Sequence, residues 1–169
     1  EVGTFSLVPR VAEAVAPVPV IAAGGVASGR HLVASMALGA VGTWSGTLWL
    51  TTREDDGHMV WKQKLLDASE DDTVRSRCYS GKPIRQMKTT WTEMWERPDS
   101  PGPLPMPLQG MLIEEIVTSI NQSDVEELMI ATGGQAVGMM KEMKPCREVI
   151  TDIIGDAQDT LDRIGGLKV

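Results

Sequence analysis

Two short apolar segments that each end in a glycine turn constrain the fold of this chain more than any other feature. Residues 18–23 and residues 40–44 are apolar and contain β-branched side chains, and a helical pattern introduced by Ser28 and Gly29 separates them. We predict a strand, a helix and a second strand in this order, with Gly39 ending the helix. Continuous apolar strands are typical of a parallel sheet buried on both faces. A right-handed crossover then places both glycine turns at the carboxyl edge of that sheet, where α/β proteins bind ligands.

The two glycine turns have the composition of a phosphate-binding site. The first contains Gly24 and Gly25, and the second reads Ser45-Gly46-Thr47. Glycines at strand ends let several backbone N–H groups approach an anion, and a following helix N-terminus adds a favourable dipole. Thr47 adds a hydroxyl donor. Together the turns predict a two-sided phosphate cup; the alternative is that the glycines only form tight turns.

Helical patterns cover most of the remaining chain. Apolar residues recur at helical spacing in five stretches: 7–15, 59–66, 112–120, 125–131 and 150–164. Pro145 is placed to begin the last of these helices and Gly165 to end it. Residues 98–108 contain five prolines. We therefore predict an extended connection there, packed on a neighbouring surface.

The small number of predicted strands bears on the fold class. Two parallel apolar strands leave unpaired edges, and a (β/α)₈ barrel takes about 250 residues. We therefore expect an α/β fold that is the C-terminal portion of a larger protein. In this prediction residues 1–57 complete the parallel sheet, and residues 58–169 form a mostly helical region that includes the proline-rich connection.

Charge and cysteine content argue against several classes of protein. The net charge of −7 disfavours broad electrostatic binding to nucleic acid or to anionic membranes. No apolar run reaches the length of about 20 residues that spans a bilayer. The two cysteines, Cys78 and Cys146, form no CxxC pair. We therefore predict reduced thiols in a cytoplasmic protein. The acidic stretch 70–72 lacks metal-ligand spacing, so we predict no metal site.

A resemblance to a known family rests on the same glycine turns. Residues 19–47 read PVIAAGGVASGRHLVASMALGAVGTWSGT. This stretch resembles the flavin-phosphate segment of the nitronate monooxygenase family, formerly called 2-nitropropane dioxygenases. Shorter similarities to the family are GTFSLVP at residues 3–9, YSGKPIR at residues 79–85, and the segment around residues 145–154.

The resemblance implies an FMN-dependent flavoprotein oxidoreductase with a (β/α)₈ TIM-type barrel. Its substrates would be an alkyl nitronate and O₂, its products a carbonyl compound and nitrite, with no nucleic acid or membrane partner. The two predicted strands would be the last two of the barrel. The FMN phosphate would be bound by the first glycine turn and by the residues in the place of the family's QMGT turn: Gly24, Gly25, Trp44, Ser45, Gly46 and Thr47.

The sequence also departs from the family pattern. Trp44 and Ser45 replace the usual Gln and Met, so only the backbone donors of that turn are carried over. The family's catalytic histidine lies in a GGHxG motif just before the segment that matches Gly3. This sequence begins after the motif, so we assign no catalytic residue and expect the C-terminal half of the enzyme. His31 and His58 do not occupy the motif and are expected to be ordinary residues.

Two other functions stay open on the sequence. One is an FMN-dependent enoyl reductase, whose barrel carries a similar AAGG and GT segment. The other is a non-catalytic half-barrel that self-associates through unpaired edges. The proline-rich segment and the helical tail favour the nitronate monooxygenase.

Four residues outside the glycine turns are further candidates with open roles. Ser80, Lys82 and Arg85 either assist phosphate or substrate binding or belong to a solvated loop. Gln135 either approaches the flavin or lies in a turn that joins helices.

Overall fold

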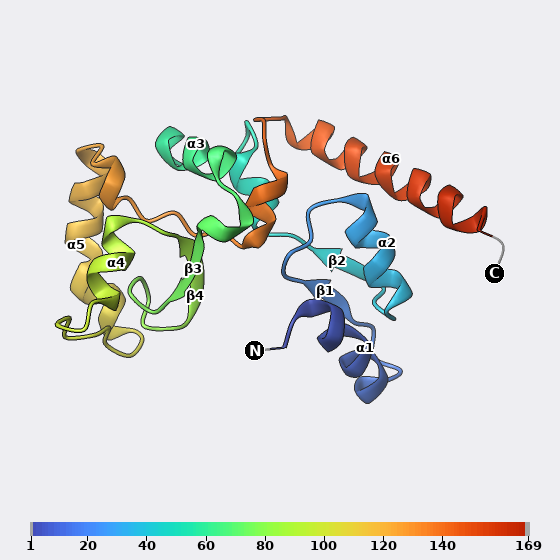
Figure 1. The fold of residues 1–169 in the computed structure, drawn as a ribbon, viewed down its shortest axis with the longest axis horizontal. Helices are drawn as coiled ribbons and strands as arrows, with labels where there is room; N and C mark the ends of the chain where they lie inside the picture. The colour runs from blue at the N-terminus through green and yellow to red at the C-terminus, as the bar shows by residue number, and fades with distance from the viewer. Residues whose placement is uncertain (1, 168–169) are drawn as a thin grey trace. The chain divides into compact units, whose positions relative to one another are not determined.

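The computed structural model describes residues 2–167, which form two compact units (Figure 1). Unit 1 contains Glu1–Asp55 and Met143–Val169, and unit 2 contains the residues between them, Asp56–Glu142. The last helix, α6 (Cys146–Gly165), belongs to the same unit as the N-terminal part of the chain.

Unit 1 is built around a parallel strand–helix–strand arrangement, as predicted. Strands β1 (Ile21–Ala23) and β2 (Gly42–Trp44) pair in parallel, with Ala22 opposite Thr43 and Ala23 opposite Trp44. The other elements of the unit are α1 (Thr4–Val15), α2 (Gly29–Ala37), the 3₁₀ helix η1 (Thr47–Thr51) and α6 (Cys146–Gly165). Both glycine turns therefore follow the carboxyl ends of neighbouring parallel strands.

Both strands of unit 1 are shorter and more exposed than predicted. Each has only three residues, and β1 begins after the two prolines at 17 and 19, which lack the N–H group that a ladder needs. The expectation of burial on both faces is wrong for this structure, since the side chains of Ile21 and Trp44 are 55% and 69% exposed. Only Ala22 of β1 is buried, in a small cluster with Val8 and Ala40.

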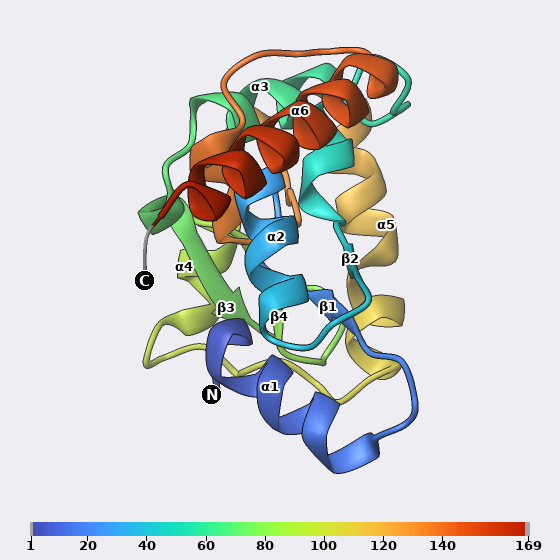
Figure 2. The ribbon, with the colours of Figure 1, turned by 90° about the vertical axis from the view of Figure 1, so that its right-hand side faces the viewer.

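Helix α6 crosses α2 and packs against it (Figure 2). Pro145 precedes its first residue and the helix ends at Gly165, as the sequence predicted. Ala157 and Thr160 are buried. Helix α2 begins after Ser28, whose side chain accepts a hydrogen bond from the backbone N–H of His31. This is the N-cap that the sequence indicated.

Unit 2 combines helices with an antiparallel hairpin that was not predicted. Strands β3 (Thr73–Ser76) and β4 (Ile84–Met87) pair with Thr73 opposite Met87. They are short and largely polar, so they lack the apolar run that marks a strand in a sequence. The helices of the unit are α3 (Met59–Asp67), η2 (Glu70–Asp72), α4 (Thr90–Glu96), α5 (Leu108–Gln122), η3 (Glu126–Leu128) and η4 (Gln135–Met139).

One predicted helix of unit 2 is wrong. The stretch 125–131 contains only the single 3₁₀ turn η3, and the chain then runs extended beside β4. There the backbone N–H of Met87 donates to the carbonyl of Ala131, and Gln86 forms a bridge with Thr132. This stretch is therefore extended because it pairs with the hairpin, although its apolar residues have the spacing of a helix.

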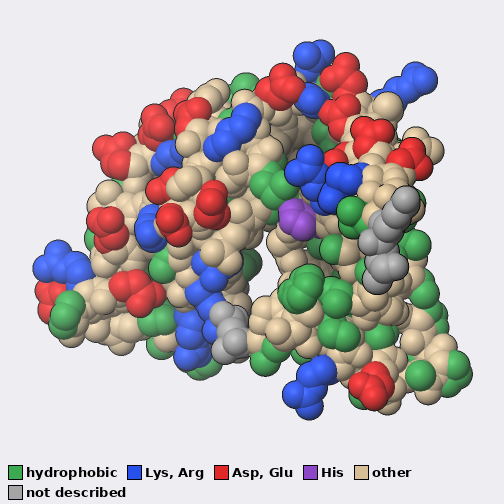
Figure 3. All heavy atoms as spheres, turned by 45° about the vertical axis from the view of Figure 1, so that its right-hand side comes forward, with side chains coloured by type: hydrophobic (Ala, Val, Ile, Leu, Met, Phe, Trp, Pro, Cys, Tyr) green, Lys and Arg blue, Asp and Glu red, His purple; other side chains and the backbone are tan. Residues whose placement is uncertain are grey.

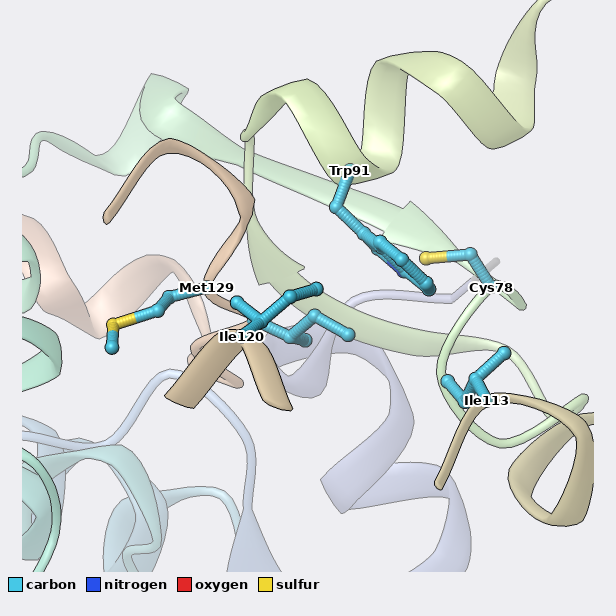
Figure 4. Packing of buried hydrophobic residues seen from close by; sticks show 6 residues of the cluster. Cys78, Trp91, Ile113, Ile120 and Met129 are labelled. Atoms are coloured by element: carbon cyan, nitrogen blue, oxygen red, sulfur yellow. The ribbon is translucent and has the colours of Figure 1, made fainter. Parts of the chain in front are cut away.

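The core of unit 2 lies between the hairpin, α4 and α5 (Figure 4). Trp91 is 6% exposed, and its ring centroid lies 6.1 Å from that of Trp95. Burial raises the pKa of the Cys78 thiol, which accepts a hydrogen bond from the side-chain amide of Gln86. Neither cysteine is in a disulfide. The buried members of this cluster are Cys78, Trp91, Ile113, Ile120, Met129 and Ile130.

The surface carries charges of both signs. On the face drawn in Figure 3, acidic side chains are widely spread, and basic side chains lie among them and in small groups. Among residues 2–167, no helix combines the length and the apolar character that crossing a membrane requires.

Candidate functional site

The turn after β1 holds its two glycines in conformations that favour glycine. Gly24 and Gly25 have φ values of +97° and +75°, and both residues are exposed. A Cβ on Gly24 would lie 3.2 Å from the Thr4 hydroxyl oxygen, whereas nothing beyond the chain neighbours lies within 4 Å of a Cβ on Gly25. The backbone at Gly25 is thus accessible to a ligand, and a side chain there would enter the same space.

The turn after β2 lies beside the first turn. The hydroxyl of Ser45 donates a hydrogen bond of 2.9 Å to the carbonyl oxygen of Val26, which directly follows Gly25. Gly46 is exposed, and no described atom beyond its chain neighbours lies within 4 Å of where its Cβ would stand. The structure therefore brings together the two glycine turns that the sequence singled out.

The side chains of the second turn differ in exposure and in their contacts. Trp44 is 69% exposed at the end of β2. The Ser45 hydroxyl hydrogen is committed to Val26, so this side chain ties the two turns together. Thr47 is the first residue of η1 and is half-buried. No local sequence pattern indicates the Ser45–Val26 bond, because it joins residues 19 positions apart.

Backbone N–H groups at the start of α2 are hydrogen-bonded within unit 1. The sequence predicts a favourable dipole from this N-terminus, and the structure shows that the protein's own groups already accept hydrogen bonds from several of the N–H groups there. The backbone N–H of Arg30 donates to the Asp156 carboxylate at 2.9 Å, and that of His31 donates to the Ser28 hydroxyl at 3.3 Å. The N–H of Ala27 donates to His31 Nδ1 at 3.2 Å. A carboxylate from α6 thus already complements the positive end of the α2 dipole.

Both histidines make hydrogen bonds at the start of a helix, in agreement with the expectation that they are ordinary residues. His31 Nδ1 accepts the Ala27 N–H, so this ring braces the start of α2. His58 precedes α3, where its Nδ1 accepts the N–H of Val60 at 3.2 Å. Its Nε2 lies 2.8 Å from a carboxylate oxygen of Asp124.

The YSGKPIR segment forms the connection within the β3–β4 hairpin. The Ser80 hydroxyl accepts the backbone N–H of Lys82 at 3.3 Å, and Arg85 donates to the Thr73 hydroxyl at 3.1 Å. Lys82 is exposed. Gly81 has φ +83°, and a Cβ there would lie 2.5 Å from the carbonyl oxygen of Leu104 in the proline-rich connection. These contacts all lie within unit 2.

Gln135 is exposed and begins the 3₁₀ helix η4, also within unit 2. Across residues 2–167, no three His, Cys, Asp or Glu side chains gather closely enough to hold a metal ion. The glycine turns of unit 1 are therefore the best candidate for a ligand site.

Comparison with known proteins points to one family. A family model described as nitronate monooxygenase matches residues 1–156. A Mycobacterium tuberculosis protein whose name assigns it to the monooxygenases is 46% identical over 173 residues, covering 99% of this chain and 46% of that protein.

Solved structures agree with this similarity. A nitroalkane oxidase from Streptomyces ansochromogenes matches with a TM-score of 0.84 and 26% identity, over 96% of this chain and 45% of that one. FabK from Thermotoga maritima matches with a TM-score of 0.79 and 33% identity, over 98% and 52%. The chain thus spans about half the length of the proteins it matches.

Proposed function

Because this chain belongs to the nitronate monooxygenase family, we propose that it supplies the FMN-phosphate site of a flavin-dependent oxidoreductase. Residues 1–57 would be the last part of a (β/α)₈ barrel whose strands include β1 and β2. The substrates would be an alkyl nitronate and O₂, and the products a carbonyl compound and nitrite. The observation that carries this proposal is the hydrogen bond between Ser45 and Val26, because it joins the two glycine turns at one edge of the parallel sheet.

The residues at this edge fit a phosphate group. Gly25 and Gly46 leave space for an anion next to the backbone, at the place that a Cβ would fill. Backbone N–H groups of the two turns would donate to the phosphate oxygens, and the Thr47 hydroxyl would add a further donor. Trp44 offers a large exposed apolar surface beside the turn. The flavin, when bound, would supply the electron transfer between nitronate and O₂.

The first test is whether the chain retains FMN. Purified chain would be mixed with FMN and gel-filtered, and the visible spectrum of the protein peak recorded. We expect a flavin band in the wild type and its loss in Gly25→Asp, because the new carboxylate would occupy and repel the phosphate position. Thr47→Ala should retain less flavin than the wild type. A colourless wild-type peak would contradict the proposed site.

A matched control separates phosphate repulsion from backbone strain. Gly102 lies in unit 2, has φ +74° and also has open space around its Cβ position. Gly102→Asp therefore introduces a similar strain and the same charge away from the glycine turns. It should retain FMN like the wild type. The same column reports self-association through the exposed strands, which the half-barrel alternative predicts.

The type of reaction needs its own measurement. Release of nitrite from an alkyl nitronate in the presence of O₂ would support the nitronate monooxygenase. Reduction of an enoyl thioester that depends on NAD(P)H, without nitrite release, would instead support the enoyl reductase.

A further inference from the structure

Thr4, the first residue of α1, contacts the glycine turn across 20 residues of sequence. Its hydroxyl lies 2.9 Å from the carbonyl oxygen of Gly24 and 3.4 Å from that of Ala23. The shorter distance is that of a well-formed hydrogen bond in which the hydroxyl donates. Thr4 therefore holds the carbonyl of the peptide that joins Gly24 to Gly25.

The orientation of this peptide determines where the Gly25 N–H points. The carbonyl of Gly24 and the N–H of Gly25 belong to one planar trans peptide and point in opposite directions. Two successive glycines with positive φ have more conformational freedom than other residues. A hydrogen bond from Thr4 on the carbonyl side therefore directs the Gly25 N–H to the opposite side. It also polarises the peptide, which makes the N–H a stronger donor.

The peptide that joins Val26 to Ala27 is held in a different way. Ser45 holds the carbonyl of Val26, and the N–H of the same peptide, that of Ala27, is committed to His31. The Gly25 N–H makes no hydrogen bond to any residue from 2 to 167. Of these two anchored peptides, only the one held by Thr4 keeps a donor for a ligand.

We propose that Thr4 is a positioning residue of the phosphate site, which presents the Gly25 N–H to the phosphate by holding the Gly24 carbonyl. This inference rests on the proposed function of the glycine turns. It assigns Thr4 no direct contact with the ligand. The loss of its hydroxyl should therefore weaken binding of the phosphate and leave binding of the isoalloxazine ring unchanged.

The test compares Thr4→Val with Thr4→Ser in the full chain. Valine keeps the shape of threonine without the hydroxyl, and serine keeps the hydroxyl. Dissociation constants would be measured by flavin fluorescence for FMN and for riboflavin, which lacks the phosphate. We expect Thr4→Val to weaken FMN binding about 5- to 10-fold, the scale of one lost hydrogen bond, with riboflavin binding unchanged. Thr4→Ser should bind FMN like the wild type.

A second readout follows the Gly25 amide directly. In ¹⁵N–¹H spectra, FMN should shift the Gly25 amide proton downfield in the wild type and in Thr4→Ser, and less in Thr4→Val. Equal weakening of FMN and riboflavin binding in Thr4→Val would mean a general structural role and would overturn the inference. Unchanged FMN binding in Thr4→Val, or failure of Thr4→Ser to preserve it, would also overturn the inference. Absence of FMN binding in the wild type would instead contradict the proposed function.

Discussion

Gly29 of α2 lies so close to Ala157 of α6 that a Cβ on Gly29 would stand 2.2 Å from the Ala157 backbone nitrogen. The same Cβ would lie 2.3 Å from the carbonyl oxygen of Ile153. These are backbone atoms inside a helix, which cannot move aside as a flexible side chain can. The absence of a side chain at Gly29 therefore allows α6 to pack on the helix that follows the first glycine turn.

We predict that alanine at Gly29 and alanine at Gly155 change the free energy of unfolding in opposite directions. Gly29→Ala should lower the free energy of unfolding of unit 1 by about 1–3 kcal/mol, because α2 and α6 must separate. Gly155 lies within α6, and its Cβ position is open. Gly155→Ala should raise the unfolding free energy by about 0.5–1 kcal/mol through the better helix propensity of alanine. Urea unfolding followed by circular dichroism measures both, and a stable Gly29→Ala variant would contradict the packing.

We predict that the negative charge of Asp156 stabilises the start of α2. Its carboxylate accepts the Arg30 backbone N–H and also lies 3.2 Å from Arg30 Nε. Asp156→Asn keeps an acceptor oxygen and removes the charge, so we expect a loss of about 0.5–1 kcal/mol in the unfolding free energy. The loss should shrink in 1 M salt, where screening is strong.

Asp152 on the same helix provides the control for Asp156. It pairs with Lys144 at 2.8 Å, and its side chain is 58% exposed. Asp152→Asn should change the unfolding free energy by less than about 0.5 kcal/mol, as is usual for an exposed ion pair. Equal losses for Asp152→Asn and Asp156→Asn would show that the α2 dipole contributes nothing.

We predict that the interaction of the Glu54 carboxylate with Cys146 makes the stability of unit 1 depend on pH. Its carboxylate accepts the backbone N–H of Cys146 at 2.9 Å, and this hydrogen bond lowers the pKa of Glu54 in the folded state. A carboxyl group whose pKa is lower in the folded state stabilises the fold at pH values above its pKa in the unfolded chain, which is about 4.3 for Glu. This stabilisation is lost as the pH falls through the pKa of the folded state. Glu54→Gln should therefore be less stable than the wild type at pH 7, and the difference should shrink as the pH falls through the lowered pKa of Glu54.

Urea titrations at several pH values would measure this difference, and Glu13→Gln on the exposed side of α1 controls for the loss of one negative charge. A difference between Glu54→Gln and the wild type that does not shrink as the pH is lowered would contradict the assignment.

The local parts of the fold were readable from the sequence, and the long-range contacts were not. The N-cap Ser28, the turns at Gly24 and Gly25, and the ends of α6 each depend on residues close in sequence. In contrast, the bonds from Thr4 to Gly24 and from Arg30 to Asp156 join residues 20 and 126 positions apart. No local pattern marks such partners, so the anchoring residues of the candidate site emerged only from the structure.

The hairpin of unit 2 likewise could not be predicted from local sequence patterns. Its strands are polar, and their pairing is supported by contacts with the extended stretch after η3, which the apolar spacing had indicated as helix. Tertiary pairing therefore decided the structure where local propensity was weak.

Gly81 and Gly102 allow backbone strain to be separated from crowding in the YSGKPIR segment. Both have positive φ, +83° and +74°, but only Gly81 is crowded, with Leu104 and Met106 backbone atoms 2.5 Å from its Cβ position. Gly102→Ala should cost about 1–2 kcal/mol of unfolding free energy, from conformation alone. Gly81→Ala should cost at least 1 kcal/mol more, because the proline-rich connection must move away from the hairpin. Unfolding monitored by tryptophan fluorescence would report this, since Trp91 and Trp95 lie in unit 2. Equal costs for the two variants would show that the close packing of the proline-rich connection on Gly81 does not stabilise unit 2.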